Sequence, residues 1–286
     1  MAEPKIPGHI AYELDSKAEN HPDFAVVTFE NGNYPEEVLT YSDIVIRGRK
    51  IAHLLVRNGI GKGDAFALIM RNHPEYVYAL YAATLTGAVM IPVDSRVRGD
   101  RLKYMLKDSK AKGVIFTSEF TDNVMNVVKD LPDVAVIGVS FKPGMERDGI
   151  DSLPLLNDIF EGPELPPPDQ RNDDIAVPIE IIYTSGTTGD PKGVVVKGNR
   201  LGTYSQLALF IWQYTPADRL YTGLSLTHGN AQAVTLMPSL LLSIPSVVSV
   251  KFTKSRIWDR DKNSLFRSLS IARPVLCVNI FVATIC

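Results

Sequence analysis

A ten-residue segment carries the residue types that a polyphosphate needs. Residues 184–193 read Thr-Ser-Gly-Thr-Thr-Gly-Asp-Pro-Lys-Gly and combine four hydroxyl side chains, three glycines and one lysine. Glycines let backbone N–H groups converge on an anion, hydroxyls donate further hydrogen bonds, and a lysine neutralises charge. The segment predicts a polyphosphate cradle made by Thr184, Ser185, Gly186, Thr187, Thr188, Gly189 and Lys192.

This segment is not the common P-loop. The pattern GxxxxGK[ST] would require glycine at position 191 and serine or threonine at position 193. The chain has Pro191 and Gly193 there, which excludes a kinase-type or Walker ATPase site. For an arbitrary loop rich in Gly, Ser and Thr, a plain hairpin turn with an exposed lysine is the commoner explanation. A longer pattern is needed to favour the cradle.

Strands and helices alternate around the cradle. The helix expected at 40–58 places its apolar residues on one face, can be capped by Thr40 or Ser42, and is followed by Gly59. The other predicted helices span residues 74–85, 101–107 and 122–129, and the predicted strands span residues 65–70, 89–93, 114–116, 134–139, 179–183 and 194–196. This order predicts an α/β fold with mostly parallel sheets covered by helices.

A change of composition divides the chain. Residues 161–174 read EGPELPPPDQRNDD, where prolines lack backbone donors and charges resist burial, so a surface connection is expected. We therefore expect an N-terminal α/β subdomain over residues 1–165. A partial second α/β subdomain with the phosphate-binding loop is expected over residues 172–286.

The overall composition argues against several classes of protein. The 286 residues are 45% hydrophobic and 22% charged, with a net charge of -2, so nothing indicates a nucleic-acid or anionic-membrane partner. No window reaches ~18 uninterrupted apolar residues, and the first residues lack the apolar stretch of a secretory signal. The two cysteines, Cys277 and Cys286, suit a reducing compartment. We expect a cytoplasmic protein with no membrane span.

The cradle belongs to a longer pattern. Residues 183–193, Tyr-Thr-Ser-Gly-Thr-Thr-Gly-Asp-Pro-Lys-Gly, resemble the phosphate-binding signature of the adenylate-forming (AMP-binding) superfamily at eleven positions in register. That superfamily includes acyl-CoA synthetases, peptide-synthetase adenylation domains and luciferases. Residues 39–42, 59–64, 87–94 and 106–112 also look like its N-terminal half, and the resemblance extends over residues 10–259. It favours the cradle over a plain turn.

A second motif lies downstream. Residues 224–230, Leu-Ser-Leu-Thr-His-Gly-Asn, resemble the family segment that lines the passage to the acyl pocket, which makes His228 and Gly229 the expected gate residues. Ser225 and Thr227 stand where proline and an aromatic are common, so a more polar or roomier pocket wall is expected. A lone histidine after a strand is more often structural. The spacing in sequence between the cradle and His228 nevertheless favours a position at the acyl pocket for this histidine.

The resemblance implies an AMP-forming acid–CoA ligase. In this family a carboxylic acid attacks the α-phosphate of ATP to give an acyl-adenylate and pyrophosphate, and the thiol of coenzyme A then displaces AMP. ATP, Mg²⁺, coenzyme A and a small-molecule carboxylic acid are the implied cofactors and substrates. Residues 184–188 and Lys192 would hold the β- and γ-phosphates, because such a reaction depends on positioning and charge neutralisation.

Part of the family machinery has no counterpart in the sequence. The expected catalytic lysine, the magnesium-binding glutamate and the small C-terminal domain are absent, so the catalytic residues are unknown and no metal ligand is assigned. The fold is expected to be the N-terminal part of the adenylate-forming large domain, incomplete at its C-terminus. Two alternatives stay open. The chain could be a truncated non-catalytic fragment that at most binds ATP, or an adenylation module for a carrier protein.

Overall fold

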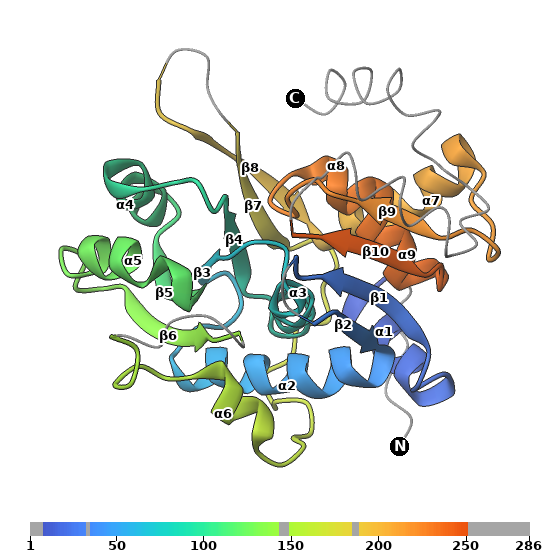
Figure 1. Cartoon of the computed structure of the whole chain (residues 1–286), viewed down its shortest axis with the longest axis horizontal. Coiled ribbons are helices and arrows are strands. Elements are labelled where there is room, and N and C mark those ends of the chain that lie inside the picture. Colours follow the sequence, from blue (N-terminus) through green and yellow to red (C-terminus); the bar gives the residue numbers. More distant parts are fainter. Residues whose placement is uncertain (1–7, 33–34, 143–148, 185–188, 251–286) are drawn as a thin grey trace.

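The computed structural model describes residues 8–32, 35–142, 149–184 and 189–250. Figure 1 shows two β-sheets with helices between and around them. Within these residues, no helix has both the length and the apolar character that a membrane crossing requires.

The larger sheet has six strands in the order β6-β5-β3-β4-β7-β8. Its first five strands are parallel, whereas β7 and β8 form an antiparallel hairpin in which Ile181 faces Val195. The strands are β3 (Ala65–Ile69), β4 (Val89–Val93), β5 (Ala111–Thr117), β6 (Ala135–Ser140), β7 (Pro178–Thr184) and β8 (Lys192–Lys197). The six strands predicted from residue 65 to residue 196 are confirmed, and so is the mostly parallel α/β fold.

The smaller sheet joins distant parts of the chain. Its strands are β1 (Ala25–Glu30), β2 (Glu37–Thr40), β9 (Leu220–Thr222) and β10 (Ser246–Ser249), in the order β2-β1-β10-β9. Thr28 of β1 lies opposite Val247 of β10. Each sheet thus takes strands from both sides of residues 165–172. The division into subdomains at that point stays a prediction about folding units, and it is not a division of the sheets.

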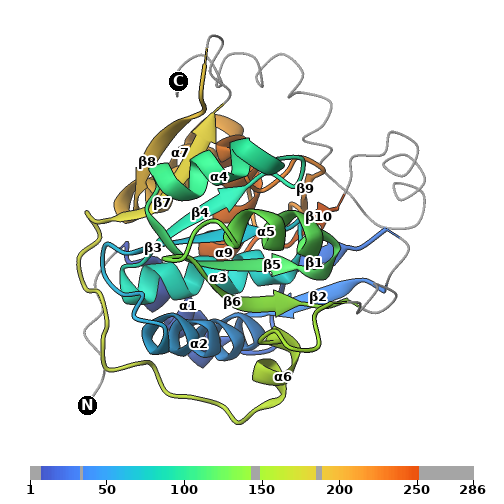
Figure 2. The ribbon, with the colours of Figure 1, turned by 90° about the vertical axis from the view of Figure 1, so that its left-hand side faces the viewer.

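Helices cover both faces of the larger sheet (Figure 2). Side chains of α4 and α5 pack on one face, and side chains of α2 and α3 pack on the other. The main helices are α1 (Ile10–Asn20), α2 (Tyr41–Arg57), α3 (Pro74–Thr86), α4 (Gly99–Asp108), α5 (Thr121–Val128), α6 (Leu156–Glu161), α7 (Gly198–Trp212) and α9 (Met237–Leu242). Three short elements complete the described chain: the 3₁₀ turn η1 (Ser118–Phe120), the single turn α8 (Gly229–Ala231) and the π-helix η2 (Gln232–Leu236).

The ends of α2 and α3 follow from local sequence. The Thr40 side chain accepts a hydrogen bond from the backbone N–H of Asp43, and the Asp43 carboxylate accepts one from the backbone N–H of Thr40. This capping box satisfies two donors that the helix leaves free. Helix α3 begins with Pro74 and ends at Gly87, whose φ of 74° is the left-handed conformation that favours glycine. The predicted helices at 40–58 and 74–85 are confirmed.

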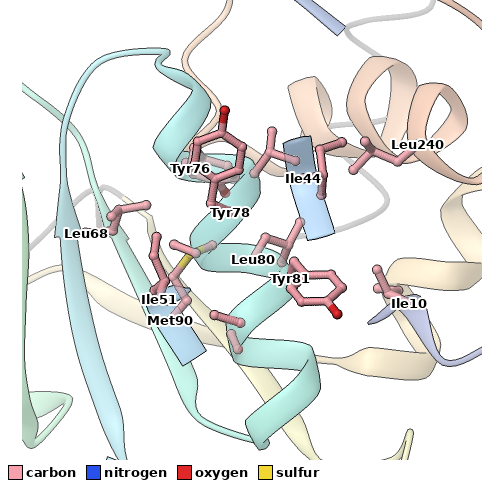
Figure 3. Close-up of a cluster of buried hydrophobic side chains, with 14 of the residues drawn as sticks. Ile10, Ile44, Ile51, Leu68, Tyr76, Tyr78, Leu80, Tyr81, Met90 and Leu240 are labelled. Carbon is pink, nitrogen blue, oxygen red and sulfur yellow. The ribbon is translucent and has the colours of Figure 1, made fainter. Parts of the chain in front are cut away.

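Helix α3 is the centre of the core. Every residue from Pro74 to Thr86 is buried. Figure 3 shows its side chains between Leu68 and Met90 of the larger sheet on one side and Ile10 and Leu240 on the other. Burying a large apolar side chain contributes about 1.5–3 kcal/mol. A helix that is buried on all sides therefore holds the two sheets together.

The proline-rich connection after α6 is largely exposed, as predicted. It is nevertheless tied to α2. Lys50 Nζ donates to the carbonyl oxygen of Phe160 at 2.8 Å, and His53 Nε2 lies 2.8 Å from the carbonyl oxygen of Pro166. These bonds hold the connection against the surface as the chain crosses to β7.

Candidate functional site

The described ends of the predicted cradle lie on the β7–β8 hairpin. Thr184 ends β7 and Lys192 begins β8, and the two residues face each other, with the Thr184 hydroxyl 3.4 Å from the Lys192 carbonyl oxygen. Both are exposed, and no atom lies within 4 Å of the position of a side chain at Gly189. Ser185, Gly186, Thr187 and Thr188 lie outside the described residues. The described strands of the hairpin project from the edge of the sheet (Figure 1).

Packing explains two other residues of the eleven-residue pattern. Tyr183 donates a hydrogen bond from its hydroxyl to Asp108 Oδ2 at 2.6 Å, which ties β7 to the end of α4. Burial, reinforced by the Asp108 carboxylate, raises the pKa of Tyr183 and keeps its hydroxyl protonated. A Cβ atom at Gly193 would stand 2.7 Å from Ile181 Cγ2, so any larger residue would push the hairpin apart. Both residues shape the loop and need not touch a ligand.

The predicted gate histidine lies near a carboxylate at the end of β4. His228 Nε2 is 3.8 Å from Asp94 Oδ2, and its side chain is 53% exposed, so a ligand could reach it. Asp94 directly follows β4 and is also bound by the side chain of Arg96, with both contacts at 2.9 Å. The Arg96 guanidinium, with a smaller contribution from His228, lowers the pKa of Asp94. Asp94 is therefore a negative charge beside the gate.

The gate segment also packs against the strand that leads into the cradle. The nearest atom to a Cβ placed at Gly229 is Ile182 Cδ1 of β7, at 3.8 Å. Strands β4 and β7 are parallel neighbours, with Met90 opposite Glu180, so their carboxyl ends reach the same edge of the sheet. Ligands of parallel α/β sheets bind at that edge. Tertiary structure thus places Asp94, His228 and Thr184 at one edge, although they are far apart in sequence.

The two hydroxyl residues of the gate motif bind each other. Ser225 Oγ lies 2.9 Å from Thr227 Oγ1, and Ser225 Oγ accepts a hydrogen bond from the backbone N–H of Thr227 at 3.3 Å. Thr227 is buried, and the backbone N–H of His228 donates to the Ser225 carbonyl oxygen at 3.0 Å. These bonds form a tight turn in front of α8. The polar or roomier pocket wall expected from these residues stays a prediction.

Asn72 anchors this turn and was not predicted from the sequence. Its amide nitrogen donates to the carbonyl oxygens of Leu224 and Ser249, and its amide oxygen accepts from the backbone N–H of Leu226, all at 2.8–2.9 Å. Asn72 is buried and precedes α3. Sequence offers only a weak signal for this role, because an asparagine near a helix start is most often a local cap.

The described ranges of the chain contain no group of three or more His, Cys, Asp or Glu side chains that could hold a metal ion. Thr184 and Lys192 supply a hydroxyl and a cation, which suit phosphate oxygens. The cradle as a site for a nucleotide polyphosphate stays a prediction, since Thr184, Gly189 and Lys192 are the cradle residues within the described ranges.

Comparison with known proteins identifies the family of the chain. The sequence profile of AMP-binding enzymes matches residues 14–264. The chain belongs to the AMP-binding enzyme family. The matched range contains both strands of the hairpin, the gate turn and helix α3.

Curated relatives of the chain are CoA ligases and fatty acid transport proteins. A medium/long-chain-fatty-acid–CoA/3-oxocholest-4-en-26-oate–CoA ligase from Mycobacterium marinum is 30% identical over 84% of this chain and 48% of its own length. A crotonobetaine/carnitine–CoA ligase from Salmonella agona is 26% identical over 86% of this chain and 47% of its length. Long-chain fatty acid transport protein 6 of Mus musculus is 26% identical over 89% of this chain and 40% of its length. The chain spans about half the length of these relatives.

Solved structures share the fold. A putative long-chain-fatty-acid CoA ligase from Rhodopseudomonas palustris superposes with a TM-score of 0.72 at 23% identity, over 87% of this chain and 59% of that one. O-succinylbenzoate coenzyme A synthetase from Bacillus subtilis, in complex with AMP, gives a TM-score of 0.67 at 19% identity, over 86% and 57%. At these identities the likeness shows the fold alone.

Proposed function

We propose that this chain carries the phosphate-binding and acyl-gate parts of an AMP-forming acid–CoA ligase. In the proposed reaction, a carboxylic acid is activated with ATP to an acyl-adenylate, and coenzyme A then takes the acyl group as a thioester. The observation that carries the proposal is the β7–β8 hairpin, with its eleven-residue pattern, at the same sheet edge as His228 and Asp94. Membership of the AMP-binding enzyme family supports it.

The cradle residues have an electrostatic role in this proposal. The hydroxyls of Thr184, Ser185, Thr187 and Thr188 and the backbone at Gly186 and Gly189 would bind the β- and γ-phosphates, and Lys192 would neutralise their charge. When bound, Mg²⁺ would add charge neutralisation on the phosphate oxygens, beside the Lys192 ammonium group. No protein nucleophile is needed, because the carboxylate of the substrate attacks phosphorus. Positioning and charge therefore account for what these residues do.

The gate residues orient the acid. His228 is exposed enough to touch a substrate, and Asp94 stands behind it as a negative charge that favours one orientation of the imidazole. Gly229 lies beside β7, where a Cβ atom would be 3.8 Å from Ile182 Cδ1. We assign His228 and Gly229 to the passage between the acid and the cradle.

The class of substrate is proposed only as a carboxylic acid. The relatives named above are described for fatty acids, a steroid acid and crotonobetaine or carnitine, which share the carboxyl group and little else. The carboxyl group is what the reaction requires, so it is the common element that this chain would recognise.

ATP–pyrophosphate exchange by the purified chain, measured with a panel of carboxylic acids, tests the proposal. ATP binding by calorimetry on the same sample separates nucleotide binding from catalysis. Exchange with an acid supports the ligase, whereas ATP binding without exchange indicates a nucleotide-binding fragment. If neither is detected, the chain alone is not a ligase.

Substitution of the cradle lysine sharpens this test. Lys192→Ala is expected to weaken ATP binding at least tenfold, since a cation in contact with phosphate is lost. Lys197→Ala is the matched control, because Lys197 is an exposed lysine at the other end of β8. Equal ATP affinity in both variants would refute the cradle.

A further inference from the structure

A closed polar cluster lies beneath the gate turn. It joins Tyr76 in the first turn of α3, Glu180 in the middle of β7 and Gln232 at the start of η2. Tyr76 donates from its hydroxyl to Glu180 Oε1 at 2.8 Å, and Gln232 Nε2 lies 2.8 Å from the Tyr76 hydroxyl and 2.9 Å from Glu180 Oε1. Glu180 and Gln232 are 0% exposed and Tyr76 is 2% exposed. The three side chains are therefore shielded from solvent and act on the protein itself.

This cluster binds the backbone of the gate turn. The carbonyl oxygen of Leu226 lies 2.9 Å from the Tyr76 hydroxyl and 3.0 Å from Gln232 Nε2. The N–H of the same residue donates to Asn72 at 2.8 Å. The backbone of Leu226 is thus held at both its donor and its acceptor, two residues before His228.

Burying these polar side chains costs more free energy than burying apolar side chains at the same positions would. A buried polar group that loses its partner costs about 1–3 kcal/mol, so these three residues tolerate little movement relative to one another. Burial raises the pKa of Glu180 to about 7, and its hydrogen bonds come from neutral partners. The π-helix that begins at Gln232 is a conformation concentrated at functional sites. Simple packing of α3 on β7 would need none of these features.

We propose that Tyr76, Glu180 and Gln232 are positioning residues for the gate. They link β7, which leads into the cradle, to the turn that carries His228, so that the imidazole stays beside Asp94. This inference rests on the proposed function in one respect, the role of His228 as a gate. The geometric part, that the cluster orients His228, can be tested without any activity.

NMR of the His228 imidazole tests that geometric part. Its signal can be assigned among the five histidines with a His228→Gln variant. Tyr76→Phe removes only the hydroxyl and is expected to shift or broaden the His228 signal. Tyr78→Phe is the matched control, because Tyr78 is equally buried on the same helix and its hydroxyl accepts from Arg47 at 2.8 Å, away from the gate. The Tyr78→Phe variant is expected to be less stable than the native protein and to show the His228 signal at its original position.

Two results would overturn the proposal. The His228 signal could stay unchanged in Tyr76→Phe, or it could move equally in both variants, which would mean general loosening. If Tyr76→Phe does not fold, a second pair replaces it. Glu180→Gln keeps an oxygen acceptor and is expected to leave the signal near its original place, whereas Glu180→Met is expected to move it. Identical signals in this pair would also overturn the proposal.

Exchange kinetics separate this inference from the proposed function. Tyr76→Phe is expected to lower the ATP–pyrophosphate exchange rate severalfold, and to have little further effect when His228 is already alanine. Equal effects in both backgrounds would show that the cluster does not act through His228. If His228→Ala itself leaves exchange unchanged, the gate assignment fails while the NMR result stands.

Discussion

Two buried glutamates near the first turn of α3 differ in their ionisation. Glu75, on α3 itself, and Glu180, on β7, are both almost completely buried. Burial alone would raise the pKa of either carboxyl group, because it penalises the charged form. For Glu180 that effect prevails and the pKa rises to about 7. For Glu75 burial is again the largest single cause, but Lys142, together with His73 and the hydrogen bond from Ser140, outweighs it, and the pKa falls to about 2.

The difference comes from the neighbours. Lys142 Nζ lies 2.8 Å from Glu75 Oε1 and 3.0 Å from Glu37 Oε1, and the Ser140 hydroxyl also donates to Glu75. Within the described part of the chain, Glu180 has no ion pair and is bound by the neutral side chains of Tyr76 and Gln232. A charged cluster thus joins β2, β6 and α3, whereas a neutral cluster lies beneath the gate. One buried cation decides which glutamate is charged.

Removing that cation should have the largest effect. Lys142→Met leaves Glu75 buried without its positive partner, and we expect the free energy of unfolding at pH 7 to fall by about 3–5 kcal/mol. Urea denaturation measures this. Lys103→Met is the control, because Lys103 pairs with Asp130 at the surface and such pairs contribute about 0–1 kcal/mol. Similar losses in the two variants would show that the Glu75 cluster is not held by its charge.

The pH dependence of stability should reveal the neutral glutamate. The pKa of Glu180 is raised in the folded state, so the stability that its bound proton contributes is complete below pH 4.5 and is lost as the pH rises through 7. Relative to Glu180→Gln, which does not titrate, the native protein should lose roughly 3 kcal/mol between pH 4.5 and pH 8. Urea unfolding at a series of pH values measures the difference. A pH-independent difference would mean that Glu180 is ionised throughout.

Neutralising both partners of the charged cluster sharpens the comparison. Lys142→Met combined with Glu75→Gln removes the unpaired charge, so the double variant should lose less stability than Lys142→Met alone. We expect a remaining loss of about 1–2 kcal/mol, because replacing both charged residues of a buried ion pair often changes the stability little. The same urea experiment provides a double-mutant cycle with the two single variants. Additive losses would mean that Lys142 and Glu75 are not coupled.

The smallest expected effect concerns a single hydrogen bond. Ser140→Ala removes the hydroxyl that donates to Glu75 and leaves Lys142 in place. We expect a loss of about 1.5 kcal/mol, the value of a hydrogen bond to a charged group. Ser205→Ala is a control, since Ser205, on α7, is equally buried and its hydroxyl has no hydrogen-bond partner among the described residues. A loss no greater than that of Ser205→Ala would argue against the Ser140 bond.

Local sequence was sufficient for most of the elements between residues 40 and 197. The capping box at Thr40, the start of α3 at Pro74 and its end at Gly87 depend on backbone sterics and on hydrogen bonds within a few residues. The cradle pattern is equally local, because its residues are adjacent. The strand predicted over residues 179–183 is confirmed. The prediction described it as apolar, however, and gave no role to Glu180 within it.

Several features of the site could not be predicted in this way. Asn72 binds the backbone of Leu224 and Ser249, and Tyr76 binds Gln232, which lies 156 residues further along the chain. Asp94 offered one usable signal, a carboxylate directly after a buried strand. The pairing of β1 with β10 has no such signal, since short apolar strands can pair with many others.

The sequence by itself therefore determined the family and the order of the main strands and helices, and it predicted the residues of the cradle. Only the tertiary structure decided which strands became neighbours. This pairing of strands brought His228 beside Asp94. It also decided the charge of each buried glutamate, since Lys142 reached Glu75 and not Glu180. Helix caps and turns depend on neighbouring residues in the chain. The ionisation of a buried carboxyl group depends on the charges and hydrogen-bond donors around it in space.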